Sequence, residues 1–120
     1  MPLTKEDVVF QYFKFIENRD IDGIIDLFDY DAVVHEPFSN IIGGLKGRSS
    51  IEPFLKVAMM ANSNLQHTIK IEKPGKTNSN KIVALITFEK GDKLKSRFTF
   101  GFADDVTVGK KIKSLNIEFL

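Results

Sequence analysis

The second half of the chain alternates apolar and polar residues, and this pattern constrains the fold more than any other feature of the sequence. A side-chain period of two is typical of strands that bury one face. Turn signals separate the runs, among them Pro74-Gly75 and Gly91-Asp92. Because the connections are short, the strands are expected to form an antiparallel meander. The expected strands are residues 68–73, 81–90, 94–103 and 112–119.

The first half carries helical periodicity instead. Apolar residues at positions 9, 12, 13 and 16 predict a helix over residues 8–16, and Thr4 with Asp7 resembles a capping box at its start. Asp20 is expected to cap a second, shorter helix. The apolar residues of that second helix are Ile21, Ile24, Ile25, Leu27 and Phe28.

Residues 32–36 form a short β-type run that Pro37 ends. A turn region rich in glycine follows. A third helix is expected from a cap at Ser49 or Ser50 to about residue 61, with Pro53 in its first turn. Helices followed by strands predict an α+β fold, with the helices packed on one face of the sheet.

Composition sets further limits. The chain of 120 residues contains no cysteine, which excludes disulfides and thiol chemistry, and its length suits a single domain over residues 1–120. No apolar run approaches the roughly 18 residues of a membrane span, and no secretory signal is visible. A cytoplasmic location without membrane attachment is therefore expected. Eleven phenylalanines and no tryptophan supply apolar volume that either fills the interior or lines a cavity.

Charge is uneven along the chain. Residues 1–60 hold six basic and ten acidic side chains, a net charge of −4, whereas residues 61–120 hold eleven and six, a net charge of +5. A basic sheet could bind an anionic partner, but aromatic residues suited to base stacking are not interleaved with its lysines. We therefore expect no nucleic-acid partner and expect the lysines to keep hairpin ends soluble. These lysines are Lys90, Lys93, Lys110 and Lys111.

Two weak motifs are set aside. The run Gly43–Ser49 has too short a gap between its glycines for a phosphate-binding P-loop, and Arg48 stands where that motif has lysine. His35, Glu36 and His67 are the only hint of a metal site, but neighbours on a strand point to opposite faces. We expect neither a metal nor another cofactor.

Glu36 and Tyr12 are the candidate catalytic residues. Pleating sets Glu36 on the strand face of Ala32 and Val34, so its carboxylate either faces the apolar interior or reaches water at the strand end. Tyr12 lies in the middle of the apolar stripe of the first helix, where its hydroxyl either is buried or reaches the surface. A buried carboxylate near a buried phenol would form a proton-transfer pair, with the phenol stabilising an oxyanion.

Three segments carry a resemblance to a known family: Val8–Tyr12, Asn18–Phe28 and Asp31–Pro37. Together they resemble the N-terminal third of the ketosteroid isomerases, and more broadly the nuclear-transport-factor-2-like (NTF2-like) superfamily with its SnoaL-like polyketide cyclases. The resemblance implies a cone, in which a strongly curved antiparallel sheet and three helices of the N-terminal half enclose an apolar pocket. It also implies a homodimer formed through the outer face of the sheet.

The isomerase resemblance also implies roles for single residues. It puts Tyr12 at the family's oxyanion-hole tyrosine and Glu36 at the catalytic aspartate, which moves a proton between two carbons of a steroid. Glu36 is one methylene longer than that aspartate. Phe98 stands where the family has a second oxyanion donor, and Leu55 falls where a supporting tyrosine can occur. Loss of one oxyanion donor typically costs about 10²–10³ in rate.

Apolar side chains on inward faces are expected to bind the substrate, a small apolar molecule, unless they simply fill the cone. These residues are Val34, Phe54, Phe98, Phe100, Leu115, Ile117 and Phe119. The sequence thus favours an isomerase-like enzyme that transfers a proton next to a carbonyl. The alternatives are a non-catalytic ligand-binding or dimerisation module of the same fold, and a SnoaL-like cyclase or dehydratase.

Overall fold

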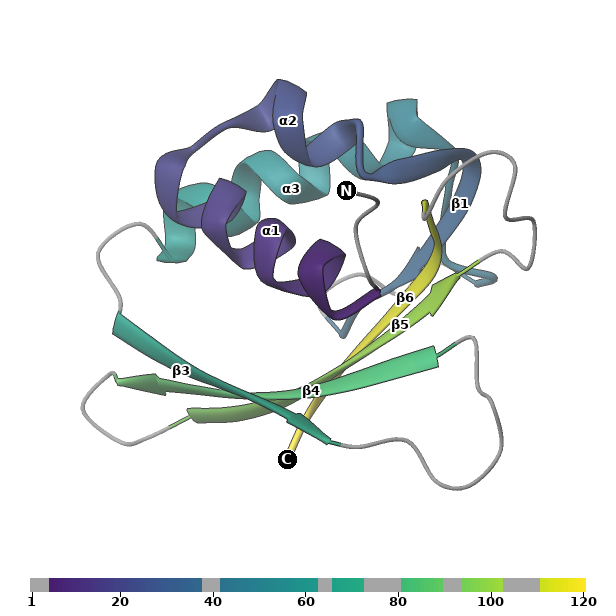
Figure 1. Cartoon of the computed structure of the whole chain (residues 1–120). Coiled ribbons are helices and arrows are strands. Elements are labelled where there is room, and N and C mark those ends of the chain that lie inside the picture. The colour runs from purple at the N-terminus through teal and green to yellow at the C-terminus, as the bar shows by residue number, and fades with distance from the viewer. Residues whose placement is uncertain (1–4, 38–41, 63–65, 73–80, 90–93, 103–110) are drawn as a thin grey trace.

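The computed structural model describes residues 5–37, 42–62, 66–72, 81–89, 94–102 and 111–120. Within these residues the helices are α1 (Lys5–Asn18), α2 (Ile21–Ile25) and α3 (Arg48–Asn62). The strands are β1 (Phe28–His35), β2 (Leu45–Lys46), β3 (Gln66–Glu72), β4 (Lys81–Glu89), β5 (Leu94–Phe102) and β6 (Ile112–Phe119). The helices lie together over one face of a curved sheet (Figure 1), which confirms the predicted α+β fold.

The described strands join one sheet in the order β2-β1-β6-β5-β4-β3. From β3 to β6, each strand pairs antiparallel with the next one in sequence, as the alternation predicts. β1 differs because it pairs parallel with β6, with Val34 beside Leu115. A parallel pair needs a long crossover, and the chain from α3 to β5 supplies it. The described sheet is therefore antiparallel except for this pair.

The core lies between the helices and the sheet. α1 buries one face because helical spacing brings its apolar residues together; these are Val8, Val9, Tyr12, Phe13 and Ile16. α3 adds the fully buried Ile51 and Leu55. β4 buries every second residue, as pleating requires: Ile82, Ala84 and Ile86. Among the described helices, none combines the length and apolar character needed to cross a membrane.

α2 is shorter than the sequence predicts. Asp20 caps it as expected, but the helix ends at Ile25. The Leu27 carbonyl accepts the N–H of Ile112 at 2.8 Å, and Phe28 begins β1. Pairing with the last strand, far away in sequence, therefore overrides the local helical pattern of these two residues.

α3 begins earlier than the sequence predicts. It starts at Arg48, and the Gly47 carbonyl accepts the N–H of Ile51 at 3.0 Å, so Gly47 takes the place of the predicted serine cap. Gly47 has a φ of 84°, a conformation that glycine adopts without steric cost. Pro53 consequently lies inside the helix rather than in its first turn, and its missing N–H leaves one helical carbonyl without the usual donor.

Arg48 joins the start of α3 to the start of β1. Its Nε and Nη2 atoms donate to the Phe28 carbonyl at 3.0 and 2.6 Å. Its guanidinium carbon lies 4.1 Å from the centre of the Tyr30 ring, and Asp26 adds an ion pair at 3.9 Å. Arg48 therefore has a structural role in the segment whose sequence resembles a P-loop.

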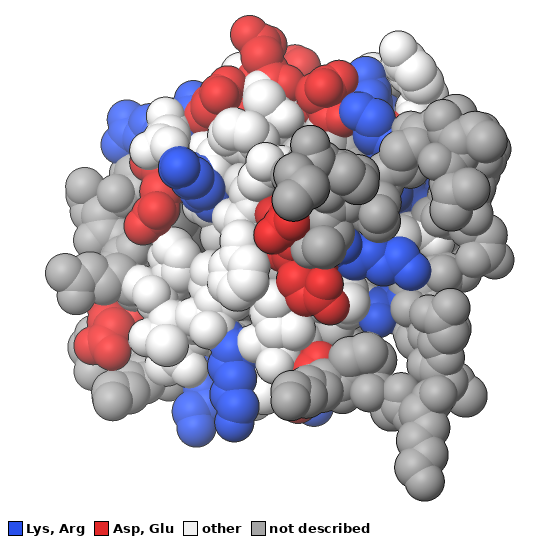
Figure 2. Space-filling view, viewed as in Figure 1, with Lys and Arg blue, Asp and Glu red and all other residues white. Residues whose placement is uncertain are grey.

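Acidic residues of the first half of the chain meet two lysines at the start of the last strand. Lys111 pairs with Asp26 at 3.7 Å, and Lys113 of β6 pairs with Asp29 and Asp31. In Figure 2, acidic side chains gather at the end of the molecule that α2 forms, with basic side chains beside them. Part of the charge asymmetry is thus neutralised within the chain. Outside the described residues lie Thr4, Lys90, Lys93 and Lys110.

Candidate functional site

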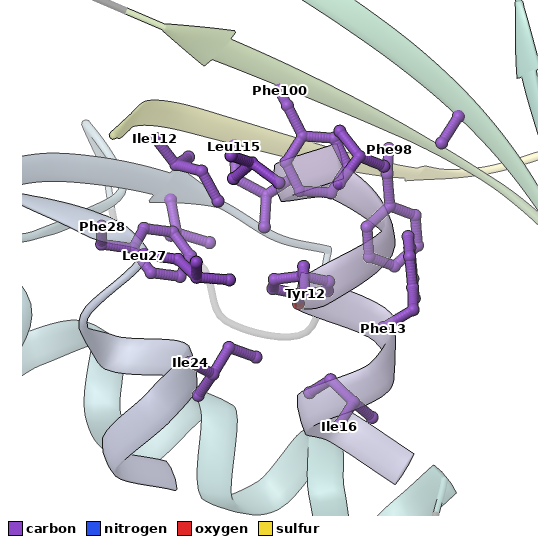
Figure 3. Close-up of a cluster of buried hydrophobic side chains, with 14 of the residues drawn as sticks. Tyr12, Phe13, Ile16, Ile24, Leu27, Phe28, Phe98, Phe100, Ile112 and Leu115 are labelled. Carbon is purple, nitrogen blue, oxygen red and sulfur yellow. The ribbon is translucent and has the colours of Figure 1, made fainter. Parts of the chain in front are cut away.

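Tyr12 of α1 is enclosed by aromatic rings between the helix and the sheet (Figure 3). Its ring centroid lies 5.0 Å from that of Phe13, 5.3 Å from Phe100 and 6.2 Å from Phe98, in edge-to-face arrangements. Phe28 of β1 adds another ring at 6.3 Å. Only 2% of Tyr12 is exposed, so the buried alternative of the sequence analysis holds.

Burial changes the chemistry of the Tyr12 phenol. Desolvation disfavours the phenolate and raises the pKa of Tyr12 well above its ordinary value of 10.0. The hydroxyl therefore stays protonated through the neutral range. In apolar surroundings a neutral phenol donates a strong hydrogen bond to a carbonyl or a developing oxyanion, because the local dielectric is low.

The register of the sheet sets five of the predicted substrate-binding residues in two neighbouring rows. In one row, Val34 of β1, Leu115 of β6 and Phe100 of β5 lie side by side. In the next row, Ile117 of β6 lies beside Phe98 of β5. Each of these side chains is at most 7% exposed. Both rows face α1, because both phenylalanines contact its tyrosine.

Glu36 directly follows β1. Extending the β1–β6 register by one residue sets Glu36 beside Ile117, which itself lies beside Phe98. Two strand spacings then separate the backbones of Glu36 and Phe98, about 10 Å. Glu36 is half-buried, between the two alternatives left open by the sequence. Phe98, whose ring contacts that of Tyr12, thus lies two strands away from the backbone of Glu36.

The remaining predicted substrate-binding residues lie at the margin of the core. Phe54 of α3 is partly buried and packs against the core. Phe119 lies at the end of β6 and is 44% exposed. It shares the strand face of Leu115 and Ile117, so the inward face of β6 meets solvent at this end. Leu55, by contrast, is fully buried in α3.

Ser96 of β5 is a polar residue of the inner face that the sequence analysis missed. It is 1% exposed, and within the described part of the chain its Oγ is the one buried side-chain polar atom that lacks a hydrogen-bond partner. Ser96 precedes Phe98 by two positions, so both residues share one strand face. Extending the alternation of the phenylalanines one step back along the strand would have identified it.

His67 of β3 also lies against the interior. Its ring centroid lies 5.8 Å from that of Phe13 and 6.1 Å from that of Phe88. Three strands separate β3 from β1, so His67 is remote from His35 at the end of β1. Among the residues that the structure describes, no three potential metal ligands come together.

No protein-family model matches the sequence, and no curated protein matches it. Solved structures do match. An NTF2-like protein of unknown function from Cytophaga hutchinsonii shares 11% identity at a TM-score of 0.67, covering 100% of this chain and 93% of that chain. SalBIII, an epoxide hydrolase/cyclase-like enzyme with a role in pyran ring formation in the polyether salinomycin, shares 16% identity at a TM-score of 0.67, covering 97% and 90%. A computationally designed 17-OHP binder shares 17% identity at a TM-score of 0.63, covering 94% and 90%.

These identities are low, so the likeness concerns the fold rather than an activity. It extends over almost the whole of each chain and includes proteins of the NTF2-like and cyclase-like kinds. The fold implied by the resemblance of residues 8–37 is thereby confirmed. With its helices over one face of a curved six-stranded sheet, this chain has the NTF2-like fold.

Proposed function

We propose that this chain binds a small, flat, mostly apolar molecule that carries a carbonyl group, and that it transfers a proton between two carbons near that carbonyl. Glu36 is the general base, and Tyr12 donates a hydrogen bond to the carbonyl oxygen. The roles come from the resemblance to ketosteroid isomerases. The observation that carries the proposal is the buried, protonated Tyr12 phenol between α1 and the inner face of the sheet.

The proposed reaction has two steps. First, the Glu36 carboxylate removes a proton from the carbon next to the carbonyl, and the C–H electron pair moves toward the carbonyl oxygen. The negative charge on that oxygen is stabilised by the Tyr12 hydroxyl. Second, protonated Glu36 returns the same proton to the far carbon of the conjugated system. The double bond shifts and no atom is gained or lost, so the net reaction is an isomerisation.

The surroundings of Tyr12 suit an apolar substrate. Phe98, Phe100, Leu115 and Ile117 present only hydrocarbon, which recognises a flat molecule through the apolar area it buries. Two proteins with similar structures, an epoxide hydrolase/cyclase-like enzyme and a 17-OHP binder, support the small-molecule part of the proposal. Because these four side chains offer no polar contact, the carbonyl end of the substrate is oriented by the Tyr12 hydroxyl.

Turnover of a β,γ-unsaturated 3-ketosteroid tests the proposal. The ultraviolet absorbance of the conjugated enone product is followed for wild type and for Glu36→Gln. The glutamine keeps the shape of the side chain and removes the base, so the rate is expected to fall by about 10²–10⁴. Glu52→Gln is the matched control, since Glu52 is a partly exposed residue of α3 paired with Lys56. Equal turnover by wild type and Glu36→Gln would remove Glu36 from the reaction.

A ligand-binding protein without catalysis is the second candidate, and Phe98 favours it. Its ring lies 6.2 Å from that of Tyr12, and the resemblance puts it where the isomerases have their second oxyanion donor. A phenyl ring cannot donate a hydrogen bond, so an oxyanion here would lose that support. Ketosteroid binding that Tyr12→Phe weakens, without turnover by wild type, would support this candidate. It would also direct further work to cyclase or dehydratase substrates.

The homodimer and the cytoplasmic location expected from the sequence stay predictions. Leu85 lies on the outer face of β4, opposite the buried Ala84 and Ile86. We expect sedimentation to give twice the monomer mass of 13.6 kDa, and Leu85→Asp to shift the protein to the monomer. A monomeric wild type would contradict the dimer.

A further inference from the structure

We propose that Ser96 is a second polar contact for the ligand, a hydrogen-bonding site for a hydroxyl or carbonyl group at the end remote from Tyr12. The inference rests on the proposed function in one respect, namely that the ligand lies on the inner face of the sheet. It assigns the ligand to a class: elongated apolar molecules with an oxygen atom at each end.

The burial of the Ser96 hydroxyl is the first argument. Ser96 is 1% exposed, and in the described part of the chain its Oγ has no hydrogen-bond partner. A buried hydroxyl without a partner is unfavourable, because it has lost its water and gained nothing in exchange. Alanine would fill the same position without this penalty, so packing alone does not account for a serine. A ligand oxygen would supply the missing partner.

The position of Ser96 relative to Tyr12 is the second argument. Ser96 precedes Phe98 by two residues and Phe100 by four on the same strand face. At the rise of a strand these separations are about 7 Å and 13 Å. Because Tyr12 contacts both phenylalanines, Ser96 lies about 10 Å from it along β5. A molecule that reaches both hydroxyls must therefore be elongated, with the phenylalanine rings along its apolar middle.

The neighbours of Ser96 across the sheet give the third argument. On β6 it lies beside Phe119, which is 44% exposed, and on β4 beside Ile86, which is fully buried. Along this row the exposure of the side chains therefore falls from Phe119 on β6 to Ser96 on β5 and Ile86 on β4. A ligand that enters past Phe119 reaches Ser96 and then extends over Phe98 toward Tyr12.

A fragment titration tests the site without depending on turnover. The ¹⁵N-labelled full chain is titrated with cyclohexanol and with methylcyclohexane, two molecules of similar size. For wild type, the amide shifts of Ser96 and Phe98 are expected to saturate at about tenfold lower concentration with the alcohol, the effect of one hydrogen bond. Ser96→Ala is expected to lose this preference, and Ser96→Thr to keep it. No response to either probe, or the same preference in Ser96→Ala, would overturn the inference.

The melting temperature of Ser96→Ala provides an independent readout. Removing an unsatisfied buried hydroxyl is expected to leave the melting temperature unchanged or to raise it. A marked decrease would mean that the hydroxyl already has a partner in the folded chain, and would overturn the inference as well.

A second pair of probes tests the spacing of the two contacts. The 4-en-3-one steroid with a hydroxyl group at the opposite end of the ring system is compared with the same steroid lacking it. Wild type is expected to prefer the hydroxylated probe about tenfold, and Ser96→Ala to bind both equally. Equal binding by wild type would overturn the inference and leave isomerase turnover intact. A preference that depends on Ser96, without isomerase turnover, would instead overturn the proposed function alone.

Discussion

At the scale of the residue, the feature of the interior that matters most for function is the Tyr12 phenol, which is packed among phenylalanine rings. The ring of Tyr12 packs edge-to-face against neighbouring phenylalanine rings, whereas desolvation raises the pKa of its hydroxyl. A phenylalanine would satisfy the same packing. The hydroxyl is therefore the part of this side chain that a ligand would use.

Tyr12→Phe separates the packing role of Tyr12 from its chemical role. Because the ring contacts remain, the free energy of unfolding is expected to change by no more than about 1 kcal/mol. Turnover of the ketosteroid is expected to fall about 10²–10³, the effect of one lost oxyanion donor. Urea unfolding and the enone assay measure the two quantities. Tyr12→Ala, which also removes the ring, should lose about 3–5 kcal/mol of stability. Full turnover by Tyr12→Phe would refute the donor role.

At the scale of the element, side chains and backbone groups far apart in sequence decide where helices and strands begin. α2 ends before Leu27 and Phe28, because the Leu27 carbonyl bonds to the N–H of Ile112 and Phe28 pairs with Ile112 as the first residue of β1. α3 begins at Arg48, whose guanidinium holds the Phe28 carbonyl. Neither contact is visible in a local sequence window.

Arg48→Lys is expected to loosen the junction of α3 and β1. Lysine cannot donate twice to the Phe28 carbonyl, and it stacks less well on Tyr30 than the planar guanidinium does. The expected loss is about 1–3 kcal/mol in the free energy of unfolding, measured by urea titration. Lys56→Ala is the control, since its exposed pair with Glu52 contributes about 0.5 kcal/mol or less. Equal losses in both variants would contradict the structural role of Arg48.

Gly43 and Gly44 lie just before β2 and form a matched pair for testing how closely the backbone of β1 approaches this turn. Both have positive φ, 85° and 82°, so alanine at either site is expected to lose about 1–2 kcal/mol of stability. A Cβ at Gly44 would also lie 2.8 Å from the Val34 carbonyl oxygen, whereas the nearest atom at Gly43 lies at 3.7 Å. Gly44→Ala should therefore be the less stable variant in urea unfolding. Equal stability would mean that the turn shifts to accommodate the methyl group.

At the scale of the whole molecule, charge links the two halves of the chain. The carboxylates of Asp26, Asp29 and Asp31 precede and begin the sheet, and the lysines that they pair with lie at its last strand. The lysine at position 113 contacts two of these carboxylates. These exposed pairs therefore act between regions that are adjacent only in the folded state.

The Asp31–Lys113 pair predicts how stability depends on pH. The Lys113 hydrogen bond lowers the pKa of Asp31 in the folded state below its ordinary value of 3.8. The contribution of Asp31 is therefore fully present above about pH 4 and is lost as the pH falls through the folded pKa. The pKa of Lys113 is raised by Asp31, so its contribution is present below about pH 10 and is lost as the pH rises through the folded pKa.

Lys113→Met checks this dependence. Its melting temperature is expected to lie below that of wild type at pH 7, and the difference should shrink as the pH falls from about 4 toward 2. High salt should also reduce the difference at pH 7, since both groups are exposed. A difference that is constant with pH and salt would assign the effect to packing of the lysine stem.

The sequence by itself determined the type of most elements and their inward faces. Pleating in β5 and β6 follows from local geometry, so Phe98, Phe100, Leu115 and Ile117 could be assigned to the inward faces, whereas the sequence left open whether the Tyr12 hydroxyl is buried. Ser96 obeys the same alternation, but a serine on an inward face gives no signal unless the pattern is extended to it. The exposure of Phe119 could not be predicted, because alternation fixes a face and not how far the helices cover it.

Only the tertiary structure decided which strands meet and in what register. The parallel pairing of β1 with β6 puts the end of β1, which Glu36 follows, two strands from Phe98, the residue whose ring contacts Tyr12. No local pattern contains this, because backbone hydrogen bonds between strands are the same for any sequence. Register is chosen by the apolar rows that pack together once the chain has folded.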